Sequence, residues 1–174
     1  MPSIDWRPGQ AGAEDFIIPA EGDRRAVTGA LWLPGTHNEH TPLILCGHGA
    51  SGDRYQAPIP HLAGRFLNEK GFATLAIDGP VHGLRQVAPG GREALAVEMQ
   101  RSGFIEDMVD DWLLAFDTIA REKSIGSGAL GYFGLSMGTI FGLPLLTEAK
   151  NRGLNFNAST LGLAGTIGVG DYVG

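Results

Sequence analysis

The chain is poor in cysteine and in long apolar runs, and each shortage excludes a class of protein. Cys46 is the single cysteine, which excludes an internal disulfide and a cysteine-rich zinc site. The longest weakly polar run, residues 161–170, is far shorter than the roughly 18 apolar residues that span a bilayer. Residues 1–10 contain Asp5 and prolines where a secretion signal needs an apolar stretch. We therefore expect a soluble, cytoplasmic protein with no membrane span.

Positive charge is also scarce. The chain has 13 lysines and arginines against 19 acidic residues, a formal net charge of −6, and no local basic cluster. Phosphate backbones repel such a surface, so we expect no nucleic-acid partner. Glycine is abundant instead: 27 of 174 residues, about twice the usual ~7%, indicate many tight turns. A domain usually has roughly 100–200 residues, and 43% of the residues of this chain are hydrophobic, which is enough for a buried core. Residues 1–174 should therefore form a single domain.

Hydrophobic periodicity predicts strands that alternate with helices. Short apolar runs bounded by turn residues predict strands over residues 16–19, 26–33, 42–46, 72–77, 129–135 and 159–164. Apolar positions at helical spacing predict helices over residues 61–70, 105–119 and 137–149. This alternation predicts an α/β fold, with a mostly parallel sheet covered by helices on both faces. The first two strands should form an antiparallel N-terminal hairpin at one edge.

The residue types within these elements predict which side chains are buried. Cys46 lies in an apolar strand and should be a small buried hydrophobe. Residues 161–164 also read as a buried strand. Aspartates between the apolar positions of the second helix should form its solvated outer face: Asp107, Asp110, Asp111 and Asp117.

One motif carries specific chemistry. Residues 134–138 read G-L-S-M-G, which matches G-x-S-x-G between a predicted strand and a predicted helix. A serine at the centre of this motif sits on a sharp turn that raises its hydroxyl above the sheet, and the helix N-terminus behind it favours negative charge. Ser136 is therefore our candidate nucleophile. The alternative is a serine that only caps the helix.

The loop after residues 42–46 is the second candidate feature, and it reads G-H-G-A at residues 47–50. A tetrahedral oxyanion needs two fixed N–H donors, and the residue after the nucleophile supplies one of them. The loop can supply the other, so we assign the oxyanion hole to the backbone N–H groups of Ala50 and Met137. We interpret His48 as a residue that pins the loop by hydrogen bonding rather than as a general base.

With these motifs the chain resembles the α/β-hydrolase family from about residue 16 to its end. The matches are the His48-Gly49 turn, the sequence D-G-P-V-H-G at residues 78–83, and Ser136. The middle segment is similar to the family's D-x-x-G-H-G loop, although Pro80-Val81 stands where a glycine is common. The resemblance implies a supporting loop that contains His48, Gly49, Asp78 and His82.

The resemblance also implies an activity. It implies hydrolysis of a small or medium acyl ester, by a serine esterase that uses neither a metal nor an organic cofactor. The oxyanion segment lacks the H-G-G-G run of one lipase and esterase branch. Dienelactone-hydrolase-like and monoglyceride-lipase-like members are therefore the closer comparisons.

The segment after Ser136 departs from the family. The family order is Ser, then Asp or Glu, then His, whereas all five histidines of this chain precede Ser136. A serine hydroxyl is a poor nucleophile without an adjacent base. Only two acids follow the serine: Glu148 lies in the predicted helix, and Asp171 lies in the loop past the last strand. Asp171 is therefore the candidate acid, with an ordinary turn aspartate as the alternative.

Three explanations of the missing histidine are open. In the first, which we favour, these residues are the N-terminal portion of an incomplete α/β-hydrolase fold. The last strands then lie on a complementary C-terminal segment or chain, which would cover an otherwise open apolar edge. In the second, the protein is a degenerate, non-catalytic binder. In the third, His82 or His48 serves as the base, which departs from the family geometry.

A rival fingerprint overlaps the oxyanion loop. Gly47, Gly49 and Gly52 spell G-x-G-x-x-G after a strand, and Asp78 ends the next strand, as in dinucleotide-binding domains. That pattern requires the third glycine to open a helix, but residues 53–60 intervene and their prolines delay the helix. A dinucleotide-binding α/β module is therefore the alternative function.

Overall fold

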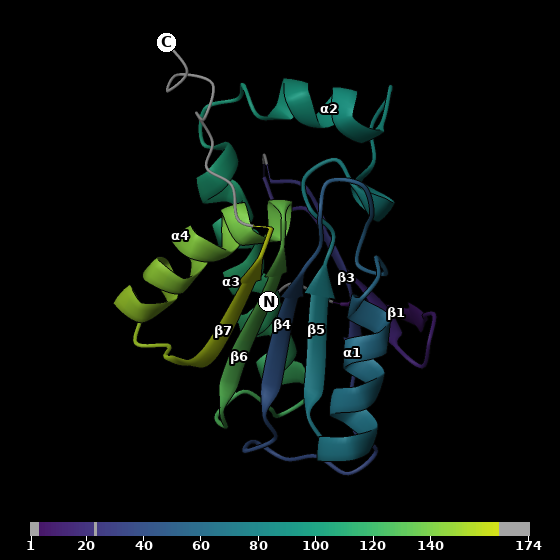
Figure 1. The fold of residues 1–174 in the computed structure, drawn as a ribbon, viewed down its shortest axis with the longest axis vertical. Coiled ribbons are helices and arrows are strands. Elements are labelled where there is room, and N and C mark those ends of the chain that lie inside the picture. Colours follow the sequence, from purple (N-terminus) through teal and green to yellow (C-terminus); the bar gives the residue numbers. More distant parts are fainter. Residues whose placement is uncertain (1–3, 23, 164–174) are drawn as a thin grey trace.

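Within residues 4–22 and 24–163, which this computed structural model describes, seven strands form one sheet. Their order across the sheet is β1-β2-β3-β5-β4-β6-β7 (Figure 1). The strands are β1 Asp5–Pro8, β2 Glu14–Ile18, β3 Val27–Trp32, β4 Leu43–Gly47, β5 Ala73–Ile77, β6 Leu130–Leu135 and β7 Phe156–Gly162. β4 pairs in parallel with both β5 and β6, and β6 with β7. β1, β2 and β3 form an antiparallel edge that joins β5 through β3.

This topology confirms the predicted α/β architecture, and its N-terminal edge contains one more strand than the hairpin. β1 pairs with β2 in the register Asp5 to Ile17. Most residues of β1 are exposed, so no alternation of apolar and polar residues marks it in the sequence.

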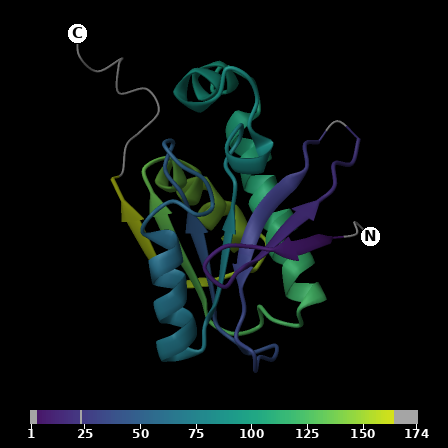
Figure 2. The same ribbon diagram turned by 90° about the vertical axis from the view of Figure 1, so that its right-hand side faces the viewer.

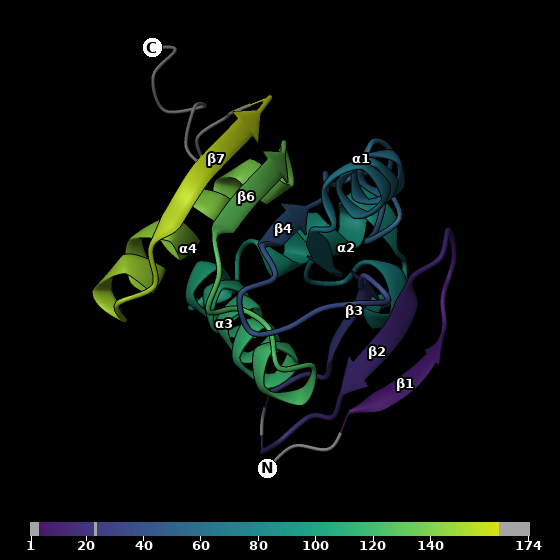
Figure 3. The same cartoon turned by 90° about the horizontal axis from the view of Figure 1, so that it is seen from below.

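Helices cover both faces of the sheet. α1 (Ile59–Arg65) lies on one face, whereas α3 (Phe104–Glu122) and α4 (Met137–Asn151) lie on the other (Figures 2 and 3). α1 continues as a π-helical turn, η1 (Phe66–Lys70), and ends at Gly71 with a left-handed φ of 66°. None of the described helices is long and apolar enough to cross a membrane.

The start of the first helix was predicted too late. α1 already begins at Ile59, because Pro60 lies in the first turn, where a helix needs no N–H donor. The prolines that were expected to delay the helix therefore open it.

Two short elements lie at the carboxyl ends of the parallel strands and were not predicted. η2 (Gly83–Arg85) is a 3₁₀ turn after β5, and α2 (Gly91–Glu98) lies across the top of Figure 1. Ala94 and Leu95 of α2 are buried in the apolar core. The helix was missed because a proline and two glycines precede or open it, which is the composition of a loop.

Alternation along the buried strands divides the core between the two faces of the sheet. Leu43 and Leu45 of β4 join the larger apolar cluster, which includes residues of α3 and α4. Cys46 joins the smaller cluster with Ile59 of α1. Burial raises the pKa of the Cys46 thiol to about 12. Cys46 is therefore the small buried hydrophobe that the sequence predicted.

Two predictions about burial are wrong. Residues 161–164 do not form a buried strand: Leu161 and Gly162 end β7, the outer strand of the sheet, and are half-buried, and Leu163 after them is 76% exposed. Ala164, the end of that predicted strand, lies outside the described residues. Asp111 is not on a solvated face, because Arg85 of η2 pairs with it at 2.6 Å and both side chains are buried.

Candidate active site

Ser136 occupies the turn between β6 and α4 in a backbone conformation that few residues adopt. Its φ of 51° and ψ of −109° lie outside the regions open to non-glycine residues. Its N–H donates to the Gly162 carbonyl at 2.8 Å, and its carbonyl accepts the Thr139 N–H at 2.8 Å. The residue is half-buried, and its hydroxyl does not cap α4. Ser136 is therefore held in a strained turn, with a side chain that the helix does not use.

Small residues on both sides of the serine let this turn pack against the neighbouring strand. A Cβ on Gly138 would collide with the backbone of Gly47 in β4, and one on Gly134 would lie 2.8 Å from the Gly138 carbonyl oxygen. The Tyr132 hydroxyl donates to the same carbonyl at 2.6 Å, and the Thr139 hydroxyl donates to the Gly134 carbonyl at 3.1 Å. The glycines of G-x-S-x-G thus meet a steric requirement of this fold.

The predicted oxyanion loop lies beside this turn because β4 and β6 are parallel neighbours. Gly47 at the end of β4 is the register partner of Gly134 in β6, so the segments after the two strands emerge at one edge. Among the described residues, neither the N–H of Ala50 nor that of Met137 donates a hydrogen bond to another backbone group. The fold therefore does not consume the two donors that were predicted for the oxyanion hole.

His48 is buried and uses both ring nitrogens on backbone groups. Nδ1 lies 2.8 Å from the Gly49 carbonyl oxygen, and Nε2 accepts the Gly79 N–H at 2.7 Å. This pattern fits a neutral ring with its proton on Nδ1. Burial lowers the pKa of His48 and the nearby His82 lowers it further, against the opposing effect of the bond to Gly49. His48 thus ties its own loop to the loop after β5.

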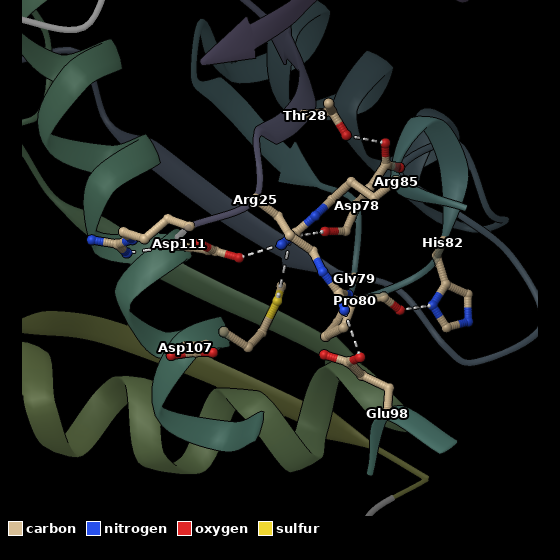
Figure 4. Close-up of polar contacts among 12 residues, drawn as sticks. Arg25, Thr28, Asp78, Gly79, Pro80, His82, Arg85, Glu98, Asp107 and Asp111 are labelled. Carbon is tan, nitrogen blue, oxygen red and sulfur yellow. Dashed lines mark hydrogen bonds and ion pairs between the residues drawn. The ribbon is translucent and has the colours of Figure 1, made fainter. Parts of the chain in front are cut away.

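His82 reaches the oxyanion loop from the other side. Its Nε2 lies 3.1 Å from the Ala50 carbonyl oxygen. Its Nδ1 lies 2.6 Å from the Pro80 carbonyl oxygen, the contact drawn in Figure 4. The side chain is buried, and its ring meets that of His48 edge-on with centroids 5.3 Å apart. Neither ring has a hydrogen bond to Ser136 in the described part of the chain. Both imidazoles therefore contact the backbone of the loops rather than the serine.

Asp78, fully buried after β5, is the polar centre of the supporting loops. Its carboxylate accepts hydrogen bonds from the Thr28 hydroxyl at 2.6 Å, the Arg54 guanidinium at 2.9 Å and the Leu84 N–H at 3.1 Å. A Cβ on Gly83, where φ is 55°, would collide with the same carboxylate. Because these groups come from β3, the loop after β4 and η2, Asp78 fixes the two loops relative to each other.

Sequence reasoning missed Arg54, which completes this network. Besides Asp78, it binds the carboxylate of Asp15 in β2 through hydrogen bonds of 3.1 and 2.8 Å. Burial alone would raise the pKa of the Asp15 carboxyl, but hydrogen bonds from Arg54 and Tyr55 outweigh this effect and leave the pKa below its ordinary value. The partners of Arg54 are 24 and 39 residues away, so no local pattern marks the residue.

A charged cavity of about 360 Å³ lies near Pro80, and Figure 4 shows part of its lining. Its charged residues are Arg24, Arg25, Arg85, Arg101, Glu98, Asp107 and Asp111. Each arginine pairs with an acid of the same set. Burial would raise the pKa of Glu98, but hydrogen bonds from Arg101 and Arg25 keep it below its ordinary value. These ion pairs connect the turn between β2 and β3 to α2 and α3, with four arginines facing three acidic side chains.

The structure joins the loops selected from the sequence through His48, His82 and Asp78, whereas Ser136 and Met137 are not among the residues that line the hollow beside them. The loops that contain Ala50 and His82 line a hollow of about 550 Å³ at the carboxyl edge of the sheet. Asp171 lies outside the described residues. Within residues 4–22 and 24–163, no group of three or more His, Cys, Asp or Glu side chains could hold a metal ion.

The dinucleotide pattern lacks the helix that it requires. Gly52 opens no helix, because α1 begins only at Ile59. A pyrophosphate would therefore find no helix N-terminus at the third glycine. The geometry does not favour this alternative.

Solved structures similar to this chain include esterases and related hydrolases. A cold-adapted esterase from an Arctic intertidal metagenomic library is 29% identical, with a TM-score of 0.71 over 92% of this chain and 66% of that one. A dienelactone hydrolase from Anabaena variabilis is 20% identical, with a TM-score of 0.57 over 87% of this chain and 64% of that one. A thermostable carboxyl esterase from Bacillus coagulans is 16% identical, with a TM-score of 0.55 over 91% and 44% of the two chains.

The chain spans about two thirds or less of the length of these proteins. No protein-family model and no curated protein matches the chain. The strand order, the strained serine turn and the solved structures nevertheless agree, and the chain has the α/β-hydrolase fold, which it shares with esterases and a dienelactone hydrolase.

Proposed function

We propose that the full protein is a serine hydrolase, a carboxylesterase for small or medium acyl esters, with Ser136 as its nucleophile. The observation that carries this proposal is the conformation of Ser136. Its φ of 51° and ψ of −109° are unfavourable for a serine, and its hydroxyl does not cap the helix. Backbone strain of this kind is retained where it serves a function, and here it holds the hydroxyl at the carboxyl edge of the sheet.

In the proposed reaction, the Ser136 oxygen bonds to the ester carbonyl carbon as its proton passes to a base. The carbonyl electrons move onto the oxygen, and the N–H groups of Ala50 and Met137 stabilise that oxyanion. Collapse of the intermediate breaks the bond to the alcohol, which takes the proton from the base and leaves an acyl-serine for water to hydrolyse.

The proton acceptor is the part of this reaction that the described residues do not supply. His48 and His82 have all four ring nitrogens within hydrogen-bonding distance of backbone groups, and no histidine follows Ser136 in the sequence. We propose that the base histidine lies on polypeptide beyond these 174 residues, either a C-terminal segment or a complementary chain. Asp171 is the proposed acid partner.

Ester hydrolysis by the full-length protein tests this function. Ser136→Ala should lower kcat/KM for p-nitrophenyl acetate and butyrate by at least roughly 10⁴-fold, because loss of a nucleophile in a serine hydrolase costs that much or more. Ser124→Ala is the matched control, since Ser124 also has a φ of 51° but is an exposed residue after α3. Turnover that survives Ser136→Ala would refute the assignment.

A further inference from the structure

The contact between two loops at the candidate oxyanion hole points to an additional role. We propose that His82 is a positioning residue that fixes the oxyanion hole by donating its Nε2–H to the Ala50 carbonyl. This inference rests on the proposed function, because it assigns a role within the same site.

The geometry connects two loops that are distant in the sequence. His82 follows β5 and Ala50 follows β4, 32 residues earlier, and the Nε2 to oxygen distance is 3.1 Å. His82 as a whole residue is 5% exposed, so water competes little for this hydrogen bond. In the described part of the chain, no other donor contacts the Ala50 carbonyl.

Ala50 lies between two peptide groups, and a histidine forms a hydrogen bond to the carbonyl of each one. A trans peptide is planar, so its carbonyl and N–H point in opposite directions. His48 holds the Gly49 carbonyl at 2.8 Å and thereby orients the plane that carries the Ala50 N–H. His82 holds the next plane through the Ala50 carbonyl. With both planes fixed, the φ and ψ of Ala50 are fixed too.

The loop itself supplies one backbone hydrogen bond around Ala50, from the Gly52 N–H to the Gly49 carbonyl at 3.3 Å, and this bond does not hold the Ala50 carbonyl. Gly49 and Gly52 flank the segment, and glycine has the most backbone freedom of any residue. Gln56 holds the residues on either side of Ala50, by accepting the Gly49 N–H at 2.6 Å and donating to the Ser51 hydroxyl at 2.8 Å. Without His82, rotation about the ψ of Ala50 would move the Ala50 carbonyl. The Ala50 N–H, the proposed oxyanion donor, would then be held less firmly.

The proposal depends on where the His82 protons are. A neutral imidazole donates from one nitrogen only, and a doubly protonated one donates from both. Nδ1 faces the Pro80 carbonyl at 2.6 Å and Nε2 faces the Ala50 carbonyl at 3.1 Å. The proposed role requires a proton on Nε2.

Two conservative variants of the full-length protein separate the two contacts of His82. The amide nitrogen of a glutamine extends about as far as Nε2, so His82→Gln keeps a donor for Ala50. The shorter asparagine reaches about as far as Nδ1, so His82→Asn keeps a donor only for Pro80. His61→Gln, on the exposed surface of α1, is the control.

The readouts are kcat and KM for a p-nitrophenyl ester and the rate of Ser136 modification by a fluorophosphonate. Loss of an oxyanion donor costs roughly 10²–10³-fold in kcat, so its misplacement in His82→Asn should cost roughly 10–100-fold with KM nearly unchanged. His82→Gln should recover most of kcat and of the modification rate. Equal rates in the two variants, whether both normal or both impaired, would overturn the proposal.

Nitrogen-15 NMR of histidine-labelled protein tests the same proposal without turnover. A protonated Nε2 on His82 at the pH of the kinetic assay is the expected result, and an Nε2 without a proton overturns the positioning role. Failure of the proposed function has a different signature, because the fluorophosphonate would then leave Ser136 of the wild-type protein unmodified.

Discussion

At the residue scale, the conformation of Ser136 links stability to function. A strained backbone of this kind costs on the order of 1–3 kcal/mol, whereas the greater freedom of glycine in the unfolded chain costs roughly 0.5–1 kcal/mol. The free energy of unfolding of Ser136→Gly should therefore be about 1 kcal/mol higher than that of Ser136→Ala. Both variants should lack activity. Urea unfolding of the two proteins measures the difference. A glycine variant no more stable than the alanine variant would mean that the turn is not strained.

His48 connects a single residue to the pH dependence of stability. Burial holds its pKa in the folded protein below the ordinary value of 6.5, so the unfolded chain binds the proton more tightly. The contribution of neutral His48 to the free energy of unfolding should therefore be complete above about pH 6.5 and should decrease as the pH falls below that value. The slope should be smaller in His48→Asn than in the wild type, as measured by urea unfolding between pH 7 and 5. His40→Asn, at an exposed position, should retain the wild-type slope.

At the scale of elements, the approach of α4 to β4 sets the position of the serine turn. A Cβ on Gly138 would collide with the Gly47 backbone, which cannot move without shifting a central strand. Gly138→Ala should therefore destabilise the fold by roughly 1–3 kcal/mol or more. Gly64→Ala in α1 should have the opposite effect and stabilise by up to about 1 kcal/mol, because a Cβ there meets nothing within 4 Å. Thermal unfolding of both variants measures the two signs, and a neutral Gly138→Ala would contradict the packing described.

The elements also show which local signals predict structure. Continuous apolar runs identified the buried strands, and helical spacing identified α3 and α4. β1 could not be found, because an edge strand with mostly exposed residues needs no apolar pattern. α2 could not be found, because glycine and proline at its start are typical of a loop, and only tertiary contacts bury Ala94 and Leu95.

At the scale of the whole molecule, the candidate site combines local and distant information. Ser136, Ala50 and Met137 were predicted from short motifs, since the chemistry requires these residues next to strand ends. The ion pair of Arg85 with Asp111 and the network of Arg54 could not be predicted, because their partners are distant in sequence. Periodicity alone therefore predicted that Asp111 is exposed, whereas its ion pair with Arg85 is buried.

Covalent modification of the full-length protein tests the central claim most directly. A fluorophosphonate probe forms a stable bond with an activated serine, and digestion followed by mass spectrometry locates the adduct. The account predicts one adduct, on the peptide that contains Ser136, and none in the Ser136→Ala variant. An adduct on a different residue, or ester hydrolysis by a protein that the probe leaves unmodified, would contradict it.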